Sequence, residues 1–224
     1  MKDDGLLTLA VDTGSPLCSV AIGAGNGLTV ELQFASGRSG PPLLERIHAL
    51  LAIAERELRD VDALIGAGGP GGFTGLRGGL ATLLGLQQVL NVRATAVSTF
   101  LPLNLQAPSS GRAVAAIDAL RGEWFVQPFG ATGRRPLEPP RIVPARAIRR
   151  WAPCRVIAFG VERLRLDLER EADVVLQEAK PLARDLLRLA ASEDLEWDSA
   201  ALSSPQYLRP PAAAVTTSPP QRGL

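Results

Sequence analysis

A glycine-rich segment at residues 68–77 is the part of this chain whose composition most clearly suggests chemistry. It reads Gly-Gly-Pro-Gly-Gly-Phe-Thr-Gly-Leu-Arg and joins an apolar run at 63–66, typical of a buried strand, to a helix predicted over about 74–90. Backbone N–H groups of such a segment, together with the helix N-terminus, could bind an anion such as phosphate. The segment lacks the Lys-[Ser/Thr] ending of a P-loop and the G-x-G-x-x-G spacing of a dinucleotide site. A tight turn with close backbone packing is the alternative, and glycine content alone leaves both open.

Two aspartates at the ends of apolar runs form a second candidate site. Asp12 follows the run 6–11, and Asp118 follows the run 113–117 in the second half of the chain. Facing aspartate turns on paired groups of strands are how the actin/sugar-kinase fold holds Mg-phosphate. The candidate nucleotide-binding residues are therefore Asp12, Thr13, Gly71 and Asp118. An aspartate after a strand also commonly stabilises its own turn, and this is the alternative.

The composition argues against hydrolytic or metal-dependent chemistry. The one histidine, His48, falls inside a predicted helix, and the two cysteines, Cys18 and Cys154, are far apart. A catalytic triad needs a base beside a nucleophile, and a metal site needs several ligands. The chain has 24 Lys plus Arg and 23 Asp plus Glu, so its net charge is too small to attract nucleic acid or an anionic membrane. With no signal peptide and no apolar run near the roughly 18 residues of a membrane span, we expect a cytoplasmic protein.

The order of the predicted elements indicates an α/β protein with two lobes. The first half begins with three strands, and the second half begins in a similar way, with an apolar strand, an aspartate turn and another strand at 124–129. Turn-forming residues at 107–111 mark the boundary between the halves. The prediction is an N-terminal RNase H-like lobe with partner-binding helices (1–106), a smaller α/β lobe (107–202) and a Pro-rich C-terminal tail (203–224).

The two helices predicted in the first half carry more apolar surface than one lobe readily buries. The first has a broad apolar stripe, and the second is apolar nearly all round although it contains Gly78, Gly79 and Gly85. Interior glycine costs a helix about 1 kcal/mol relative to alanine, and close approach of another helix would offset that cost. A deeply buried core helix is the alternative. The residues predicted to bind a partner, and to form a homodimer when the chain is alone, are Leu44, Ile47, Leu51, Leu76, Leu80 and Leu83.

Four motifs, taken together, resemble one known family. They are Leu9-Ala10-Val11-Asp12-Thr13, the string from Gly69 to Arg77, Ala115-Ala116-Ile117-Asp118-Ala119 and Gln206-Tyr207-Leu208-Arg209-Pro210. Their order and spacing over roughly residues 5–211 are similar to the TsaB (YeaZ) family of bacterial tRNA threonylcarbamoyladenosine biosynthesis proteins. The Gly-Pro-Gly-x-Phe-Thr-Gly-Leu-Arg pattern is the most specific of the four.

The resemblance implies a fold, a function and partners. The fold would be two lobes of the actin/sugar-kinase (RNase H-like) type, with mixed sheets flanked by helices. The chain would be a noncatalytic subunit that binds and activates a TsaD-like catalytic subunit, with a TsaE-like ATPase as the third component and tRNA bound through the complex. No cofactor of its own is expected, and ATP or ADP at the joint surface with the partner is left open.

Two further interpretations of the residues remain open. The same fold also serves free-standing ATP-dependent kinases and ATPases, which would need Asp12, Asp118 and another acidic group for Mg-ATP. An arginine cluster between Arg134 and Arg155 could contact tRNA phosphates. Because the net charge of the chain is near zero, we favour a solvated face for that cluster.

Overall fold

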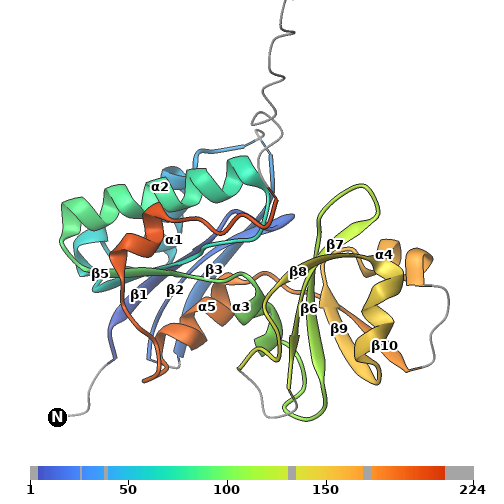
Figure 1. The fold of residues 1–224 in the computed structure, drawn as a ribbon. Helices are drawn as coiled ribbons and strands as arrows, with labels where there is room; N and C mark the ends of the chain where they lie inside the picture. Colours follow the sequence, from blue (N-terminus) through green and yellow to red (C-terminus); the bar gives the residue numbers. More distant parts are fainter. Residues whose placement is uncertain (1–4, 26, 38–39, 131–134, 169–172, 210–224) are drawn as a thin grey trace, which may run out of the picture.

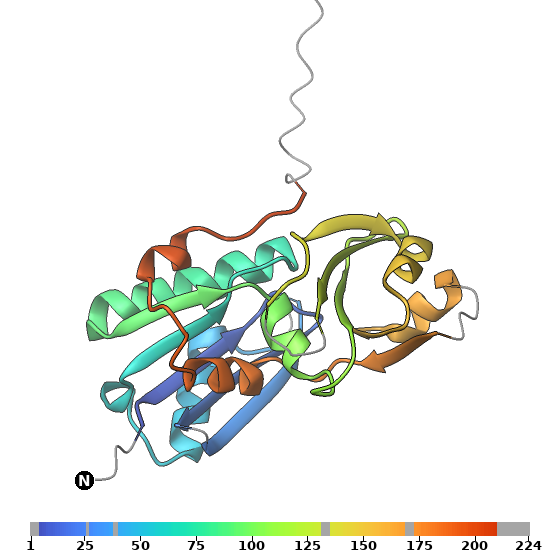
Figure 2. The same cartoon turned by 60° about the horizontal axis from the view of Figure 1, so that its bottom comes forward.

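The chain folds around two five-stranded sheets, which stand side by side in the computed structural model (Figures 1 and 2). The structure describes residues 5–25, 27–37, 40–130, 135–168 and 173–209. Most strands are continuous apolar runs, and the helices carry apolar residues on at least one side, so each sheet has faces that helices can cover.

The first sheet contains the early strands of the chain in the order β3-β2-β1-β4-β5. β1 pairs with β2 and β2 with β3 in antiparallel fashion, whereas β1, β4 and β5 are parallel to one another. The strands are β1 (Leu7–Asp12), β2 (Leu17–Ala24), β3 (Gly27–Ala35), β4 (Ala63–Ala67) and β5 (Arg93–Val97).

Helices cover both faces of this first sheet. α1 (Leu43–Ile53) and α2 (Phe73–Leu90) lie on one face, and α5 (Ala183–Ala190) lies on the other (Figure 1). Leu9 and Leu64 point toward α1 and α2 into one apolar cluster, while their strand neighbours Ala10 and Ile65 meet α5 in another. The period-two alternation of the strands therefore supplies a core on each side of the sheet.

The second sheet repeats the topology of the first. Its order is β10-β9-β6-β7-β8, with an antiparallel β6-β7-β8 part and β6, β9 and β10 parallel. The strands are β6 (Ala113–Asp118), β7 (Glu123–Phe129), β8 (Arg141–Pro144), β9 (Cys154–Ala158) and β10 (Val174–Glu178). α4 (Val161–Leu168) and the 3-10 helix η2 (Ala145–Trp151) share a core with one face, and α3 (Phe100–Leu105) packs against the other. The predicted fold class of two lobes with mixed sheets is confirmed.

The C-terminal part of the chain returns to the first sheet. α5 packs on β1 and β2, and the 3-10 helix η3 (Ser199–Ser203) packs on β5 and α2. The sequence-based division placed α5 and most of η3 in the second lobe at 107–202, whereas both segments pack against the first sheet and its helices. Residues 183–203 complete the first lobe, and the second lobe is inserted between the parts of the first.

The predicted elements differ from the structure mainly at the less apolar segments. The helix predicted through Leu58 ends at Ile53, because Glu55 has a positive φ of 54° and Leu58 begins the separate 3-10 helix η1 (Leu58–Asp60). β8, β10, α3 and α4 have no counterpart in the sequence prediction.

Candidate functional site

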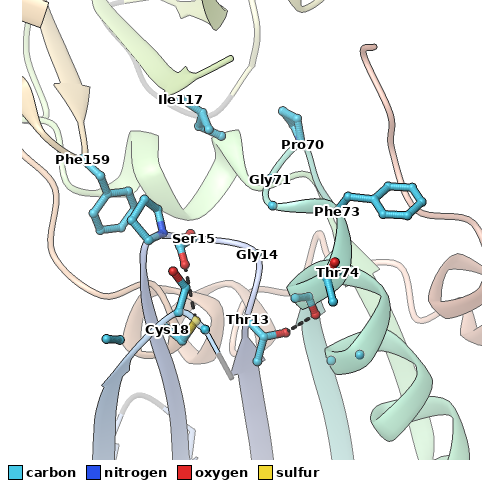
Figure 3. Close-up of a pocket in the computed structure, with 18 of the residues that line it drawn as sticks. Thr13, Gly14, Ser15, Cys18, Pro70, Gly71, Phe73, Thr74, Ile117 and Phe159 are labelled. Carbon is cyan, nitrogen blue, oxygen red and sulfur yellow. Dashed lines mark hydrogen bonds between the residues drawn. The ribbon is translucent and has the colours of Figure 1, made fainter. Parts of the chain in front are cut away.

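A cleft of about 1480 Å³ lies between the two lobes and contains most of the segments singled out by sequence (Figure 3). The first lobe contributes the turn between β1 and β2, the glycine string and the first turns of α2. The second lobe contributes the end of β6 with the following turn, and Phe159. Side chains such as Pro70, Phe73, Ile117 and Phe159 make much of the lining apolar.

Asp12 is buried behind the cleft and holds its own turn. One carboxylate oxygen, Oδ1, accepts hydrogen bonds from the backbone N–H of Gly14 at 3.0 Å and of Ser15 at 3.2 Å. The other, Oδ2, is buried without a partner among the described residues. Burial raises the pKa of Asp12 from 3.8 to about 6 and outweighs these hydrogen bonds, which lower it. The turn-stabilising role that the sequence left as an alternative is therefore present in the structure.

The glycine string packs directly against the β1–β2 turn. The Gly72 N–H donates to the Gly14 carbonyl at 2.7 Å, and a Cβ at Gly71 would lie 2.7 Å from the same oxygen. Thr13 Oγ1 donates to the Gly75 carbonyl at 2.8 Å (Figure 3), and a Cβ at Gly75 would overlap the Thr13 carbonyl oxygen. Here the glycines allow a close approach of α2 to the turn, and the Gly72 N–H that an anion would need is already used.

Asp118 occupies the equivalent turn in the second lobe. Its Oδ1 accepts from the Leu120 N–H at 2.7 Å, and its Oδ2 pairs with Arg163 of α4. The structure thus brings Thr13, Gly71 and Asp118 to the wall of one cleft and leaves Asp12 buried behind it. Binding of a nucleotide by these residues stays a prediction.

The leucines predicted to bind a partner are mostly part of this chain's own core. Five of the six side chains are at most 3% exposed and pack together between the helices and the first sheet: Ile47, Leu51, Leu76, Leu80 and Leu83. Only Leu44 is on the surface, 49% exposed. The assignment of the five as surface residues is corrected, because an apolar pattern does not tell which side of a helix faces its own sheet.

The outward sides of the same helices carry residues that the predicted partner-binding set did not include, although the glycines among them were noted in the sequence. On α2 they include Gly78, Ala81 and Gly85. Apart from the adjoining residues and the backbone of α2 itself, no described atom lies within 4 Å of a Cβ built at either glycine. Val89 at the end of this row is 80% exposed, and Ile53 on α1 is 60% exposed. The spacing of small residues at 78, 81 and 85 is the signal that could have identified this face.

The remaining sequence candidates lie away from the cleft. His48 is on the exposed side of α1. Arg146, Arg149 and Arg150 are exposed on η2, and Arg141 forms an ion pair with Glu138 at 3.3 Å. Arg134 falls outside the described residues. Within the described part of the chain, no three His, Cys, Asp or Glu side chains gather into a group that could hold a metal ion.

Known proteins resemble the chain in both sequence and fold. The family model described as "TsaD: tRNA N6-adenosine threonylcarbamoyltransferase" matches residues 35–134. The Escherichia coli K12 protein described as "tRNA threonylcarbamoyladenosine biosynthesis protein TsaB" is 27% identical over 218 residues, covering 90% of this chain and 94% of that protein.

Two solved structures from Pseudomonas aeruginosa extend the resemblance to the fold. An uncharacterised protein with similarity to peptidase YeaZ has a TM-score of 0.76 at 27% identity, covering 91% of this chain and all of its own. A structure of YeaZ has a TM-score of 0.68, also at 27% identity, covering 83% of this chain and 90% of its own. The resemblance to TsaB/YeaZ is confirmed. Component A of an Acidaminococcus fermentans dehydratase, with a TM-score of 0.50 at 12% identity, shares the fold alone.

Among the residues that the structure describes, no helix is both long enough and apolar enough to cross a membrane.

Proposed function

We propose that this protein is the noncatalytic subunit of a complex that forms N6-threonylcarbamoyladenosine in tRNA, and that it binds and activates a TsaD-like catalytic subunit. The observation that carries the proposal is the similarity to TsaB across 90% of the chain, together with the shared two-lobed fold. A TsaE-like ATPase would be the third component, and tRNA would be bound through the complex.

The outward faces of α1 and α2 are the surface that fits such a partner. They lie on the same side of the first sheet (Figure 1), with Leu44, Ile53 and Val89 exposed. Gly78 and Gly85 leave open space above α2, so a helix of another chain can approach its backbone closely. Close approach increases van der Waals contact between helices and would offset the cost of glycine in the helix. The same face would form a homodimer when the chain is alone.

The alternative is a free-standing ATP-dependent kinase or ATPase that uses the cleft. The observation in its favour is that both aspartate turns and the glycine string meet there. Against it, Asp12 is buried, and both aspartates hold their own turns. ATP or ADP at the joint surface with the partner remains compatible with the first proposal, with no cofactor belonging to this chain alone.

An experiment with one matched pair of variants tests the partner surface. Ala81→Arg places a charge on the exposed face of α2, and Leu166→Arg places the same charge on the exposed side of α4, where Leu166 is 82% exposed. Burying an unpaired charge at an interface costs several kcal/mol, and each 1.4 kcal/mol is about tenfold in affinity. Ala81→Arg should therefore weaken binding to the TsaD-like protein of the same cell at least about tenfold, while Leu166→Arg binds normally.

The same proteins, reconstituted on unmodified tRNA, separate the outcomes. Loss of both binding and modification with Ala81→Arg alone supports the proposal. Normal partner binding by a folded Ala81→Arg variant refutes this interface. Failure of the wild-type protein to bind or stimulate the partner refutes the proposed function. ATP turnover by the chain alone that Asp12→Ala abolishes would favour the kinase alternative.

A further inference from the structure

The segment that follows η3, residues 204–209, contacts both lobes. It leaves η3 on the first lobe, passes the glycine string and reaches the turn between β6 and β7 of the second lobe. Tyr207, Leu208 and Arg209 all line the interlobe cleft. We call residues 204–209 the strap.

One end of the strap is held by the first lobe. The Gln206 N–H donates to the Gly68 carbonyl at 2.7 Å. Gly69, with φ of +107°, lies against the Gln206 carbonyl, which would be 2.5 Å from a Cβ at that position. The glycine string is therefore shaped to receive the strap backbone, a contact that a residue with a side chain at position 69 would prevent.

An aromatic and cationic cluster at the start of α2 strengthens this end. Arg77 Nε donates to the Tyr207 hydroxyl at 2.7 Å, and the Arg77 guanidinium lies 4.1 Å from the centre of the Phe73 ring. The Phe73 and Tyr207 ring centres are 5.3 Å apart. Such cation–π and aromatic contacts add to the apolar area that the rings bury.

The other end of the strap is held by the second lobe. Arg209 Nη1 donates to the Ala119 carbonyl at 2.8 Å, and Arg209 Nη2 forms an ion pair with Glu123. Leu208, between the two ends, packs against the core cluster that includes Phe129 and Ile157 of the second sheet. The charge-assisted contacts of Arg209 are to Ala119 in the β6–β7 turn, which lines the second lobe's wall of the cleft, and to Glu123 at the start of β7.

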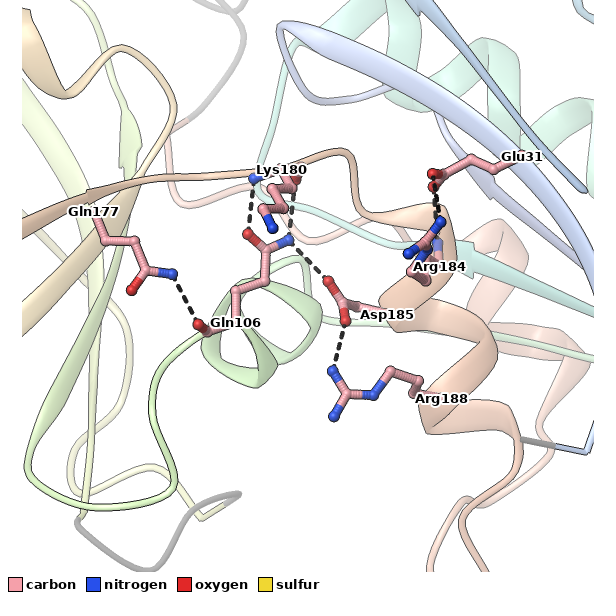
Figure 4. A network of polar contacts seen from close by, with 7 residues as sticks. All are labelled: Glu31, Gln106, Gln177, Lys180, Arg184, Asp185 and Arg188. Atoms are coloured by element: carbon pink, nitrogen blue, oxygen red, sulfur yellow. Dashed lines mark hydrogen bonds and ion pairs between the residues drawn. The ribbon is translucent and has the colours of Figure 1, made fainter. Parts of the chain in front are cut away.

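The covalent crossings between the lobes lie elsewhere. One crossing follows α3 and the other precedes α5. The Gln106 side chain connects the two (Figure 4): its Oε1 accepts a hydrogen bond from the Lys180 N–H at 2.8 Å, and its Nε2 donates to Asp185 Oδ2 at 2.8 Å. Figure 1 places α3 and α5 at one side of the lobe junction and the strap at the α2 side. The crossings thus have the position of a hinge, and the strap joins the lobes away from it.

We propose that the strap fastens the two lobes across the mouth of the cleft, so that the cleft opens only when the Tyr207 end or the Arg209 end is released. Such a fastening needs neither the partner nor the tRNA reaction. The four consecutive residues 206–209 carry it, because together they contact two walls of one cleft.

Distances between spin labels test the proposal in the full chain. Labels on Arg56→Cys and Leu166→Cys report on the first and second lobes, since both positions are exposed and the native Cys18 and Cys154 are buried. Arg209→Ala should broaden the distribution of distances between the two labels and shift its mean relative to the labelled protein that keeps Arg209. Arg141→Ala, which removes an ion pair within the second lobe, should leave it unchanged.

Hydrogen exchange supplies a second measurement. In Arg209→Ala, the backbone amides of Gly68, Gly69, Gly71 and Gly72 and of residues 118–123 should exchange roughly tenfold faster, which corresponds to about 1.4 kcal/mol of opening free energy. A folded Arg209→Ala with unchanged distances and exchange overturns the proposal. If that variant does not fold, hydrogen exchange in the wild-type protein decides. A common exchange rate for the strap and both cleft walls supports the proposal, and a strap whose amides exchange much faster than both walls overturns it.

Discussion

Replacing Gly75 with alanine should destabilise the protein, whereas the same change at Gly78 should not. Both glycines are in α2, three residues apart. A Cβ at Gly75 would overlap the backbone oxygen of Thr13, while a Cβ at Gly78 meets no described atom within 4 Å outside the adjoining residues and the α2 backbone. The pair therefore changes the same atoms in the same helix and differs only in which side of α2 receives them.

The magnitudes follow from what each methyl group meets. Alanine gains up to about 1 kcal/mol over glycine in a helix, and Gly78→Ala should keep that gain. At Gly75 the overlap costs typically about 1–3 kcal/mol, and displacement of α2 also threatens the bond from Thr13 to the Gly75 carbonyl, which contributes about 1 kcal/mol. We expect the two variants to differ by about 2–4 kcal/mol in free energy of unfolding.

Urea and thermal unfolding of the two purified variants measure this difference. For a chain of this size, 1 kcal/mol moves the melting temperature by about 2–4 °C, so the midpoints should be roughly 5–15 °C apart. Equal stability of Gly75→Ala and Gly78→Ala would show that the contact between α2 and the β1–β2 turn is not tight, and the explanation of the glycine string would fail.

Three other predictions concern charge and burial. Burial raises the pKa of Asp12 from 3.8 to about 6. Asp12 therefore stabilises the folded state below about pH 4, and this contribution is lost as the pH rises through about 6. In the native protein the free energy of unfolding in urea should fall by up to about 3 kcal/mol over that pH range, and Asp12→Asn should remove this fall. Leu80→Asp should unfold the chain rather than only dissociate it, since Leu80 is 3% exposed, and a circular dichroism spectrum like that of the native protein would contradict this. Replacing Arg146, Arg149 and Arg150 together by alanine should leave tRNA modification by the reconstituted complex nearly unchanged, whereas a large loss of tRNA affinity with a flatter salt dependence would reveal phosphate contacts.

Much of the first lobe was predictable because its apolar runs are long and clearly bounded. The helix expected over 74–90 is α2 at Phe73–Leu90, and the strand expected at 63–66 is β4 at Ala63–Ala67. In the second lobe the signals were weaker. α3 contains Pro102, which argues against a helix, and β10 is an edge strand with no buried residue, so its sequence lacks the apolar run of a central strand.

The site was predictable in position but not in orientation. Sequence identified the turns at Asp12 and Asp118, and the topology brings both to the region between the lobes. Neither the burial of the Asp12 carboxylate nor the inward direction of Leu51 and Leu76 follows from periodicity, because the pattern is the same whichever apolar side meets the sheet. The strap contacts join residues up to 138 positions apart, as between Gly68 and Gln206, a separation that local sequence signals do not report.

The return of α5 to the first sheet has a consequence for synthesis of the chain on the ribosome. β5 ends at Val97, but the helix that covers the second face of its sheet begins at Ala183. At about 5–20 residues per second, the intervening chain takes roughly 4–17 s to make. During that time Ala10, Ala21 and Ile65, which α5 buries in the finished protein, have no native cover. The period of synthesis before α5 has been made is therefore when this protein most needs protection from aggregation.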